Sequence, residues 1–379
     1  MRTKAAIIRE PKQDGWEIVD VDIDDPKAGE VQVKLAASGL CHSDEHLLTG
    51  DLQFESYPIM GGHEGAGVVT KVGEGVIGLE EGDHVVLAFI PACGTCPPCS
   101  EGLQNLCDNG AGLLTGRAIS DGGFRVHTAD GEDVATMCLL GTFAPHVTVH
   151  QSSVIKIEKD IPLDKAALLG CGVCTGWGSA TEIGGAKEGD IVVVVGVGGI
   201  GINSVQGAAA AGARAIVAVD PVEFKREKAK EFGATHTCSS MDEAMALVGE
   251  ISWGRMADLV ILTMGVVEGK DLLPGLLLTG KGRRCVVVGL GDMMAVDAQV
   301  SIMDLAMQQK TLQGAIFGGT GPRKQIPHLL HQYRAGNLKL DELVTKTYRL
   351  EEINQGYQDM RDGKNIRGMV VYTDADRGK

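Results

Sequence analysis

Hydrophobic and polar positions follow two different rhythms along the chain. Up to about residue 150, short extended runs alternate with glycine-rich turns such as Gly82-Asp83, a pattern typical of antiparallel strands in a barrel-like region. The clearest of these runs are Val31–Ala36, Gly67–Val72 and His84–Phe89.

The second rhythm begins near Gly189 with Asp190–Gly196, a continuous β-branched run that predicts a strand buried on both faces. A glycine turn and an alanine-rich helical stretch follow, and Pro221–Phe232 has the pattern of a charged helix that Gly233 ends. Strands that alternate with helices in this way predict a doubly wound parallel sheet. The remaining strands expected are Ala215–Asp220, Leu259–Thr263, Arg284–Val288, Leu312–Phe317 and, after further helices, Gly368–Tyr372.

Composition adds an acidic charge and an excess of glycine, 53 of 379 residues against an average share of ~7%. The formal net charge of −15 disfavours binding to nucleic acid or anionic membranes. Apolar stretches stay well under the ~20 residues of a spanning helix, and the run after Met1–Lys4 is too short for a signal peptide. We therefore expect a soluble, cytoplasmic enzyme or binding protein of two or three domains, in which clustered thiols are more often metal ligands than disulfides.

Four cysteines gather in the segment CGTCPPCSEGLQNLC. Cys93, Cys96, Cys99 and Cys107 have the spacing of ligands around one ion, and zinc with four thiolates is the expected closed structural site. An iron–sulfur cluster and a disulfide pair are the alternatives that this spacing leaves open. Because four thiolates leave no open coordination position, such a zinc would stabilise a loop and take no part in chemistry.

A glycine turn follows the first strand of the predicted parallel sheet. Its pattern, G-x-G-x-x-G, is formed by Gly196, Val197, Gly198, Gly199, Ile200 and Gly201. Such glycines let the backbone approach a pyrophosphate at a helix N-terminus. Asp220, at the tip of the next strand, can accept hydrogen bonds from both ribose hydroxyls, which favours NAD over NADP, although Lys225 and Arg226 are near enough in sequence to flank that ribose. A glycine-rich turn in an empty sheet is the alternative.

Three further segments carry residue types that ligate metals. They are CHSDEH (Cys41–His46), GHEG (Gly62–Gly65) and GCG (Gly170–Gly172). Spacing alone does not connect them. A lone Cys171 is most often a small buried apolar residue, and a lone His63 is usually a hydrogen-bonded core or turn residue. From residue types alone, a three-part metal site is therefore one reading among several.

Taken in order, these motifs resemble those of one family. GLCHSDEH, GGHEGAG, CGTCPPC-x7-C, GCG-x2-TG, VGVGGIG and AVD are similar to motifs of the zinc-containing alcohol dehydrogenases of the medium-chain dehydrogenase/reductase superfamily, over essentially the whole chain. The resemblance implies an α/β protein with a GroES-like β-barrel catalytic domain and a doubly wound parallel-sheet (Rossmann) coenzyme domain. The implied ranges are 1–172 for the catalytic domain, 173–316 for the NAD-binding domain and 317–379 for the return to the catalytic domain.

The resemblance also implies a catalytic zinc and roles for the residues around it. Cys41, His63 and Cys171 would hold this zinc, with water or substrate as the fourth ligand, and Ser43 and His46 would relay the proton of an alcohol. Two thiolates would leave the zinc formally neutral yet still a Lewis acid that lowers the pKa of a bound alcohol. The other implied roles are an orienting carboxylate at Asp44, a less defined position beside zinc at Glu64, coenzyme phosphate contacts at His42 and Arg367, a nicotinamide contact at Thr175, a local cation at Lys225 and a substrate-pocket wall at Phe89.

The activity implied is interconversion of alcohols and aldehydes with NAD. An aromatic side chain at Phe89 would narrow the pocket and favour primary alcohols; the alternative is that Phe89 is an ordinary core residue. The chain resembles one subgroup more closely, the nicotinoprotein (NDMA-dependent type) alcohol dehydrogenases, which retain NAD and pass electrons to another acceptor. The segments that carry this resemblance are FIPACGTC, LLTG followed by ISDG, GINSVQGAAAAGA and VDPVEFKRE.

Three other points stay open at the level of sequence. A glutathione-dependent formaldehyde dehydrogenase is an alternative, with Arg117 and Arg125 as candidate cations for the glutathione carboxylates. A non-catalytic zinc- or dinucleotide-binding protein is another, although it has no need of an open zinc position with a proton exit. Family resemblance alone implies a homo-oligomer, dimer or tetramer, joined through the coenzyme domain.

Overall fold

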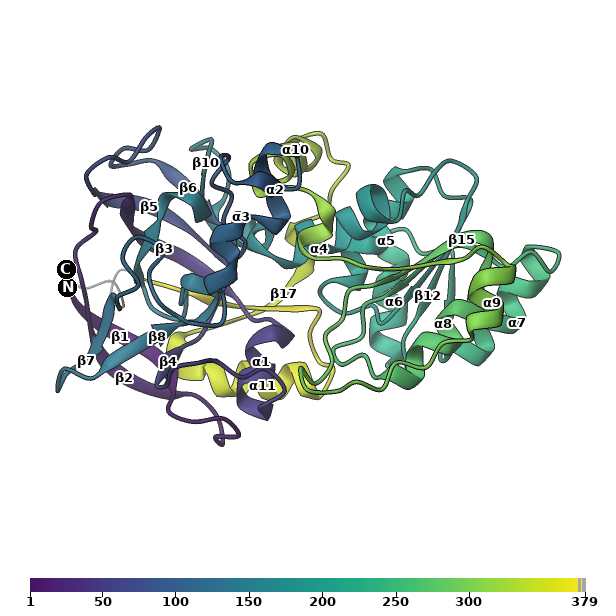
Figure 1. Ribbon diagram of the computed structural model, residues 1–379, viewed down its shortest axis with the longest axis horizontal. Helices are drawn as coiled ribbons and strands as arrows, with labels where there is room; N and C mark the ends of the chain where they lie inside the picture. The colour runs from purple at the N-terminus through teal and green to yellow at the C-terminus, as the bar shows by residue number, and fades with distance from the viewer. Residues whose placement is uncertain (374–375, 377–379) are drawn as a thin grey trace. The chain divides into compact units, whose positions relative to one another are not determined.

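The computed structural model describes residues 1–373 and 376, which form two compact units (Figure 1). The first, called the barrel unit below, contains Met1–Cys171, Gly321–Tyr333 and the described residues from Leu340 onward. The second, the sheet unit, contains Gly172–Thr320 and Arg334–Lys339. Among the described residues, no helix has both the length and the apolar character needed to cross a membrane.

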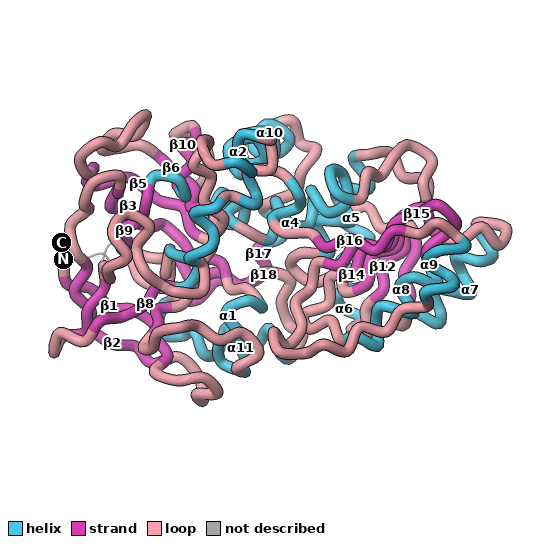
Figure 2. The backbone as a smooth tube through the Cα atoms, viewed as in Figure 1, coloured by secondary structure: helices cyan, strands magenta, loops and turns pink. Residues whose placement is uncertain are grey.

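A closed barrel and a larger sheet make up the barrel unit, and Figure 2 shows their strands in magenta. The closed barrel has the order β1 (Arg2–Ile8), β2 (Glu17–Ile23), β7 (Val126–Thr128), β8 (Asp133–Thr136) and β4 (Ile59–Met60). The larger sheet has the order β10 (Val154–Ile157), β6 (His84–Leu87), β5 (Gly65–Val72), β3 (Glu30–Gly39), β18 (Arg367–Val371) and β17 (Val344–Tyr348), with β9 (His146–His150) paired to β3. Most neighbours are antiparallel, as predicted, but β4 and β8, and β17 and β18, are parallel pairs.

The sheet unit is built on a six-stranded sheet whose paired strands are all parallel. Its order is β13 (His236–Cys238), β12 (Ala215–Val219), β11 (Ile191–Val195), β14 (Ala257–Leu262), β15 (Thr279–Val287) and β16 (Thr311–Gly314). Every residue of β11 and β12 is buried, as expected of central parallel strands with helices on both faces. The predicted fold class, a GroES-like barrel with a doubly wound parallel sheet, is confirmed.

Helices connect these strands and carry several of the candidate residues. Those of the sheet unit are α4 (Gly172–Gly178), α5 (Gly201–Ala210), α6 (Glu223–Glu231), α7 (Met241–Ile251), α8 (Leu272–Leu278) and α9 (Ile302–Met307). The other helices are α1 (His42–Thr49), α2 (Pro97–Ser100), α3 (Leu163–Ala166), α10 (Pro322–Arg334) and α11 (Ile353–Arg361). Within the sheet unit, α4 packs on α5 and α7 packs on α8.

The predicted strand ending at Phe317 is wrong over its last three residues. Strand β16 stops at Gly314, and Phe317 begins a 3₁₀ turn that continues to Gly319. Gly318 and Gly319 both have positive φ, +68° and +78°, and a Cβ on Gly318 would lie 2.4 Å from the Cys174 carbonyl oxygen. This close approach needs glycine and breaks the extended run. Sequence reasoning also missed β13, because its His-Thr-Cys run is short and shows no apolar alternation.

Candidate active site and metal centres

Helix α1 begins directly after Cys41 and places Ser43 and His46 on one face, since residues three apart are neighbours on a helix. The helix ends at Gly50, whose φ of +79° suits glycine. The Ser43 hydroxyl lies 3.7 Å from Cys41 Sγ, and His46 Nδ1 lies 3.1 Å from Asp51 Oδ2. Both members of the predicted relay therefore stand on the helix that starts at a predicted zinc ligand.

The structure brings together the three segments that spacing could not connect. Cys41, His63, Glu64 and Cys171 are all buried, and one ligand atom from each lies within 4.8 Å of the others. His63 Nδ1 contacts Asp44 Oδ1 at 3.2 Å, while the buried Nε2 has no hydrogen-bond partner in the described part of the chain. With Asp44 accepting from Nδ1–H, Nε2 is the nitrogen that would give up its proton and offer a lone pair to a metal. An imidazole nitrogen beside two thiols is a donor set that fits zinc and leaves one coordination position open.

Electrostatics at this quartet favour a cation. The hydrogen bond with Cys171 and the charge of His63 hold the pKa of the Cys41 thiol well below its ordinary value, and the same contact raises the pKa of Cys171. Burial lowers the pKa of His63, but Asp44 and Cys41 raise it well above its ordinary value. Without a metal the second thiol is thus held protonated, whereas a divalent cation would stabilise two thiolates together.

Glu64 forms a buried ion pair with Arg367, which sequence reasoning did not foresee. Strand β18 pairs with β3 at Met369 and Gly39, and this pairing brings Arg367 to the site from 303 residues away. A Cβ on Gly39 would lie 2.1 Å from Glu64 Oε2, so only glycine leaves room for the pair. Arg367, expected to contact coenzyme phosphate, therefore has its guanidinium on Glu64. No local sequence signal links these residues.

Phe89 lies against His63, with ring centroids 5.8 Å apart and nearly perpendicular planes. Its backbone N–H donates to the carbonyl of Gly170 at 3.2 Å, which fixes the segment after β6 next to the segment that carries Cys171. An aromatic ring in this place can form one wall of a pocket beside the metal ligands. His42, the other residue of α1 expected to contact coenzyme, is exposed.

The four clustered cysteines form a second candidate metal centre. The sulfur atoms of Cys93, Cys96, Cys99 and Cys107 lie within 4.8 Å of one another, and two pairs are 3.9 Å apart. Sulfurs around one tetrahedral zinc, at ~2.3 Å from the metal, stand ~3.8 Å apart. A disulfide is excluded because all these cysteines are free. These sulfur–sulfur distances are those of ligands on a single ion. An iron–sulfur cluster would need its four cysteine sulfurs farther apart, so zinc fits the site better.

Backbone N–H groups point at these sulfurs and prepare them for a cation. Thr95 and Cys96 donate to Cys93 Sγ at 3.4 and 3.3 Å, and Asp108 donates to Cys96 Sγ at 3.4 Å. Burial raises the pKa of Cys93, but Thr95 and Cys96 outweigh it and lower that pKa to about 6. Such donors stabilise thiolates, the form that binds metal.

The glycine turn of the sheet unit has the form of a phosphate-binding loop. Gly196 has a φ of +86°, and a Cβ on Gly201 would lie 1.9 Å from the Gly196 carbonyl oxygen, which lets α5 pack close to β11. A Cβ on Gly198, in contrast, would meet no atom within 4 Å, so this glycine borders open space at the N-terminus of α5. The side chain of Asn203 donates to the Gly199 carbonyl at 2.8 Å, and Ile200 occupies the N-cap position of α5.

Asp220 follows β12 and braces the same turn. Its carboxylate accepts from the N–H of Val197 at 3.0 Å and of Val222 at 2.9 Å. Arg226 donates to the Asp220 carbonyl at 2.7 Å, and Lys225 is half-buried on α6. The carboxylate thus stands at the tip of the strand, as predicted for a ribose acceptor.

Thr175 also belongs to the sheet unit, on α4. Its hydroxyl is buried and has no hydrogen-bond partner among the described residues. Helix α4 packs tightly on the glycine turn, because a Cβ on Gly176 would lie 2.1 Å from the Ile200 carbonyl oxygen. An unpartnered buried hydroxyl beside a dinucleotide turn is a group that a ligand could satisfy.

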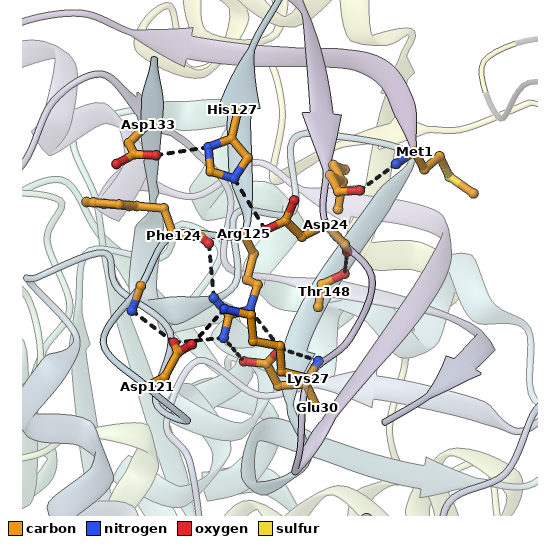
Figure 3. Close-up of polar contacts among 12 residues, drawn as sticks. Met1, Asp24, Lys27, Glu30, Asp121, Phe124, Arg125, His127, Asp133 and Thr148 are labelled. Carbon is orange, nitrogen blue, oxygen red and sulfur yellow. Dashed lines mark hydrogen bonds and ion pairs between the residues drawn. The ribbon is translucent and has the colours of Figure 1, made fainter. Parts of the chain in front are cut away.

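Arg125, a candidate for binding glutathione, is committed elsewhere (Figure 3). Its guanidinium bonds Glu30 through two nitrogens at 2.8 Å and Asp121 at 2.8 Å, and only 3% of its side chain is exposed. Arg117 is exposed and stacks on Phe124, 4.5 Å from the ring centroid. Arg125 is therefore not available for a substrate carboxylate, and the expectation that it could serve one is wrong.

The chain matches two family models, described as "Alcohol dehydrogenase GroES-like domain" over residues 27–159 and "Zinc-binding dehydrogenase" over residues 199–334. It is 49% identical over 377 residues to "Alcohol dehydrogenase B" of Mycobacterium tuberculosis, with 100% of both chains covered. It is 50% identical over 373 residues to "NDMA-dependent alcohol dehydrogenase" of Amycolatopsis methanolica, covering 98% of this chain and 100% of the relative.

Solved structures agree with these relatives. Benzyl alcohol dehydrogenase of Acinetobacter calcoaceticus is 29% identical, with a TM-score of 0.89 and coverage of 98% of this chain and 100% of its own. An alcohol dehydrogenase zinc-binding domain protein of Burkholderia ambifaria is 31% identical, with a TM-score of 0.91 and coverage of 98% and 99%. The family models and relatives, together with the barrel, the parallel sheet and the two clusters of ligand side chains, show that this chain is an enzyme of the zinc-containing alcohol dehydrogenases in the medium-chain dehydrogenase/reductase superfamily.

Proposed function

We propose that the chain interconverts primary alcohols and aldehydes by hydride transfer with NAD, at a zinc held by Cys41, His63 and Cys171. The observation that carries this proposal is the buried donor set, in which one ligand atom from each residue lies within 4.8 Å of the others and His63 Nε2 has no hydrogen-bond partner among the residues that the structure describes. When bound, zinc supplies a Lewis acid that polarises the alcohol oxygen, and NAD supplies the hydride acceptor.

The surrounding residues orient the ligands and move the proton. Asp44 holds His63 by its Nδ1–H, so Nε2 faces the metal position. Ser43 would accept the alcohol proton and pass it through a ribose hydroxyl of NAD to His46, which would release it to solvent. The position of both side chains on one face of α1 supports this route. Phe89 narrows the space beside His63, which favours an unbranched carbinol carbon, as in primary alcohols.

We assign a second, structural zinc to Cys93, Cys96, Cys99 and Cys107. Four sulfurs at tetrahedral separations, with backbone N–H groups aimed at three of them, support this assignment. With no position left for a substrate, this zinc would stabilise its loop and nothing more.

NAD is assigned to the coenzyme domain, range 173–316. The pyrophosphate would lie at the turn of Gly196, Gly198, Gly199, Ile200 and Gly201, where Gly198 leaves open space. Asp220 would accept the ribose hydroxyls with its remaining lone pairs, and a 2′-phosphate would meet its negative charge. Thr175 would contact the nicotinamide end, and His42, Lys225 and Arg367 would supply local cations against the net charge of −15.

We further propose that NAD is retained as a prosthetic group and that electrons leave to an external redox acceptor. The 50% identity to an NDMA-dependent alcohol dehydrogenase supports this version. Native mass spectrometry of the purified chain should show two zinc ions and one NAD per subunit. A primary alcohol should then reduce a dye such as NDMA without NADH appearing in solution, whereas release of free NADH would indicate an exchanging coenzyme.

Replacement of Cys171 by alanine tests the catalytic site itself. The variant should lose one zinc, keep the other and lose turnover, because two remaining ligands hold zinc weakly. Full activity in this variant would exclude Cys171 as a ligand of a catalytic zinc, and one zinc per chain without turnover in the unaltered protein would favour a non-catalytic binding protein.

We also propose a cytoplasmic homo-oligomer, dimer or tetramer, joined through the coenzyme domain. Strand β16 is an edge of the parallel sheet, and the segment that precedes it along the chain carries large apolar side chains that are exposed. These side chains are Leu290, Met293, Met294, Val296, Ile302, Met303 and Met307. An apolar surface of this kind is typical of a subunit interface.

A further inference from the structure

The carboxylate of Asp44 orients His63, and among the described residues only one of its two oxygens takes part in hydrogen bonds. Oδ1 accepts from the Gly62 N–H at 2.8 Å and contacts His63 Nδ1 at 3.2 Å. Oδ2 is buried and has no hydrogen-bond partner in the described part of the chain. A buried carboxylate oxygen without a donor is costly, so this atom calls for a partner.

The hydroxyl of Tyr357, on α11, is the complementary group. It too is buried without a hydrogen-bond partner among the described residues, and no part of the side chain is exposed. Burial raises the pKa of Tyr357 well above its ordinary value, and the negative charge of the nearby Asp44 raises that pKa further. The hydroxyl therefore keeps its proton and lies next to the carboxylate that lacks a donor.

An aromatic cluster fixes the Tyr357 ring in this place. The ring centroid of Tyr357 lies 5.8 Å from Trp16 and 6.3 Å from Phe143, and those two rings are 5.2 Å apart. Trp16 and Phe143 pack directly on the turn before His63, since a Cβ on Gly61 would lie 2.3 Å from Trp16 and one on Gly62 would lie 2.6 Å from Phe143. The same cluster thus supports both the zinc ligand and the tyrosine.

We propose that Tyr357 is a positioning residue of the metal site, whose hydroxyl donates to Asp44 Oδ2 and so fixes the carboxylate that orients His63. This inference rests on the proposed function, because it takes His63 to be a zinc ligand. The tyrosine acts as a neutral donor: it stabilises the carboxylate as an anion, and the anion keeps the proton of His63 on Nδ1 and the lone pair on Nε2. The chain of contacts runs Tyr357–Asp44–His63.

Tyr357→Phe removes the hydroxyl and keeps the ring, so the aromatic packing is preserved. Its matched control is Tyr348→Phe, which removes a buried hydroxyl that donates to Asp359 at 2.8 Å in the same unit. Release of zinc from the purified, metal-loaded chain to a coloured chelator is followed over time. Y357F should release one of its two zinc ions about 3- to 10-fold faster than the unaltered protein, a smaller effect than the ~10- to 100-fold of direct partners of metal ligands.

The second zinc of Y357F should leave at the unaltered rate, which also shows that the variant is folded, and Y348F should match the unaltered protein for both ions. With Co²⁺ in the catalytic site, Y357F should shift the visible absorption bands, whereas Y348F should not. Unchanged release and unchanged bands in Y357F would overturn the positioning role while leaving the proposed function intact. Absence of zinc from the catalytic site of the unaltered protein would overturn both.

Discussion

The ion pair between Glu30 and Arg125 offers a sharp test of how the barrel unit is held together. Glu30 begins β3 and Arg125 precedes β7, and both are almost fully buried, with 1% and 3% of their side chains exposed. Two hydrogen bonds of 2.8 Å join them, and Asp121 accepts a further hydrogen bond from Arg125 (Figure 3). Ser120 also bonds both side chains. The substitution Glu30→Gln keeps the size of the side chain and removes its charge, which leaves the buried guanidinium of Arg125 with Asp121 as its charged partner.

The structure sets the expected magnitude. Removing one partner of a buried ion pair costs roughly 3–5 kcal/mol, because the remaining charge is left in a medium of low dielectric constant. Asp121 still faces the guanidinium, so the lower end of the range, about 3 kcal/mol, applies to Glu30→Gln. At about 2–4 °C per kcal/mol for a domain of this size, the melting temperature should fall by about 6–12 °C at pH 7.

This contribution depends on pH in a defined direction. Burial raises the pKa of Glu30, but hydrogen bonds from Arg125, Ser120 and the Lys27 N–H outweigh it and hold the pKa below its ordinary value of 4.5. The folded-state pKa is therefore below the unfolded one. The stabilisation is present above about pH 4.5 and is lost as the pH falls through the folded-state pKa.

Differential scanning calorimetry between pH 4 and pH 8 measures the effect. The control is Glu351→Gln, since the Lys4–Glu351 pair has a similar contact at 3.2 Å but is 57% and 40% exposed. That variant should lose less than ~1 kcal/mol. A melting temperature for Glu30→Gln within 2 °C of the control, or a deficit that grows as the pH falls below 4.5, would refute the reasoning.

Three further outcomes are expected. Ser43→Ala should lower alcohol oxidation at neutral pH by about 10²-fold with zinc content intact, and unchanged turnover would rule out the relay. Gly201→Ala should destabilise the sheet unit, because its Cβ would lie 1.9 Å from the Gly196 carbonyl oxygen, whereas Gly198→Ala should fold normally and retain less NAD by native mass spectrometry. Cys107→Ser should remove one zinc, lower the melting temperature and leave the Co²⁺ spectrum of the catalytic site unchanged.

Local patterns in the sequence were sufficient for the features that depend on near neighbours. The run of β-branched residues at 191–195 predicts a buried strand, and the turn at 196–201 predicts close packing of strand and helix, because these depend on residues a few positions apart. The cluster from Cys93 to Cys107 falls in the same class, since its ligands lie on one loop. The strand expected at Leu312–Phe317 fails in its last residues where Gly318 makes a close approach to another segment that periodicity does not report.

The candidate zinc site, as a set of residues, could be predicted from the sequence only through family resemblance. Cys41, His63 and Cys171 lie on three separate segments, and each alone has an ordinary structural reading. The tertiary structure decides that they meet, because the strand pairing around β3 and the start of α1 bring the segments to one point.

Only the tertiary structure decided which distant side chains complete that site. Glu64 and Arg367 are 303 residues apart, and their pair exists because β18 lies next to β3 at Gly39, a glycine that leaves room for both side chains. Tyr357 reaches Asp44 because α11 and the aromatic cluster hold it there. Hydrophobic periodicity and motif spacing depend on residues close together in the sequence, so they predict helices, strands and turns. Contacts between distant residues depend on how the strands pair and which side chains are buried together, which only the tertiary structure shows.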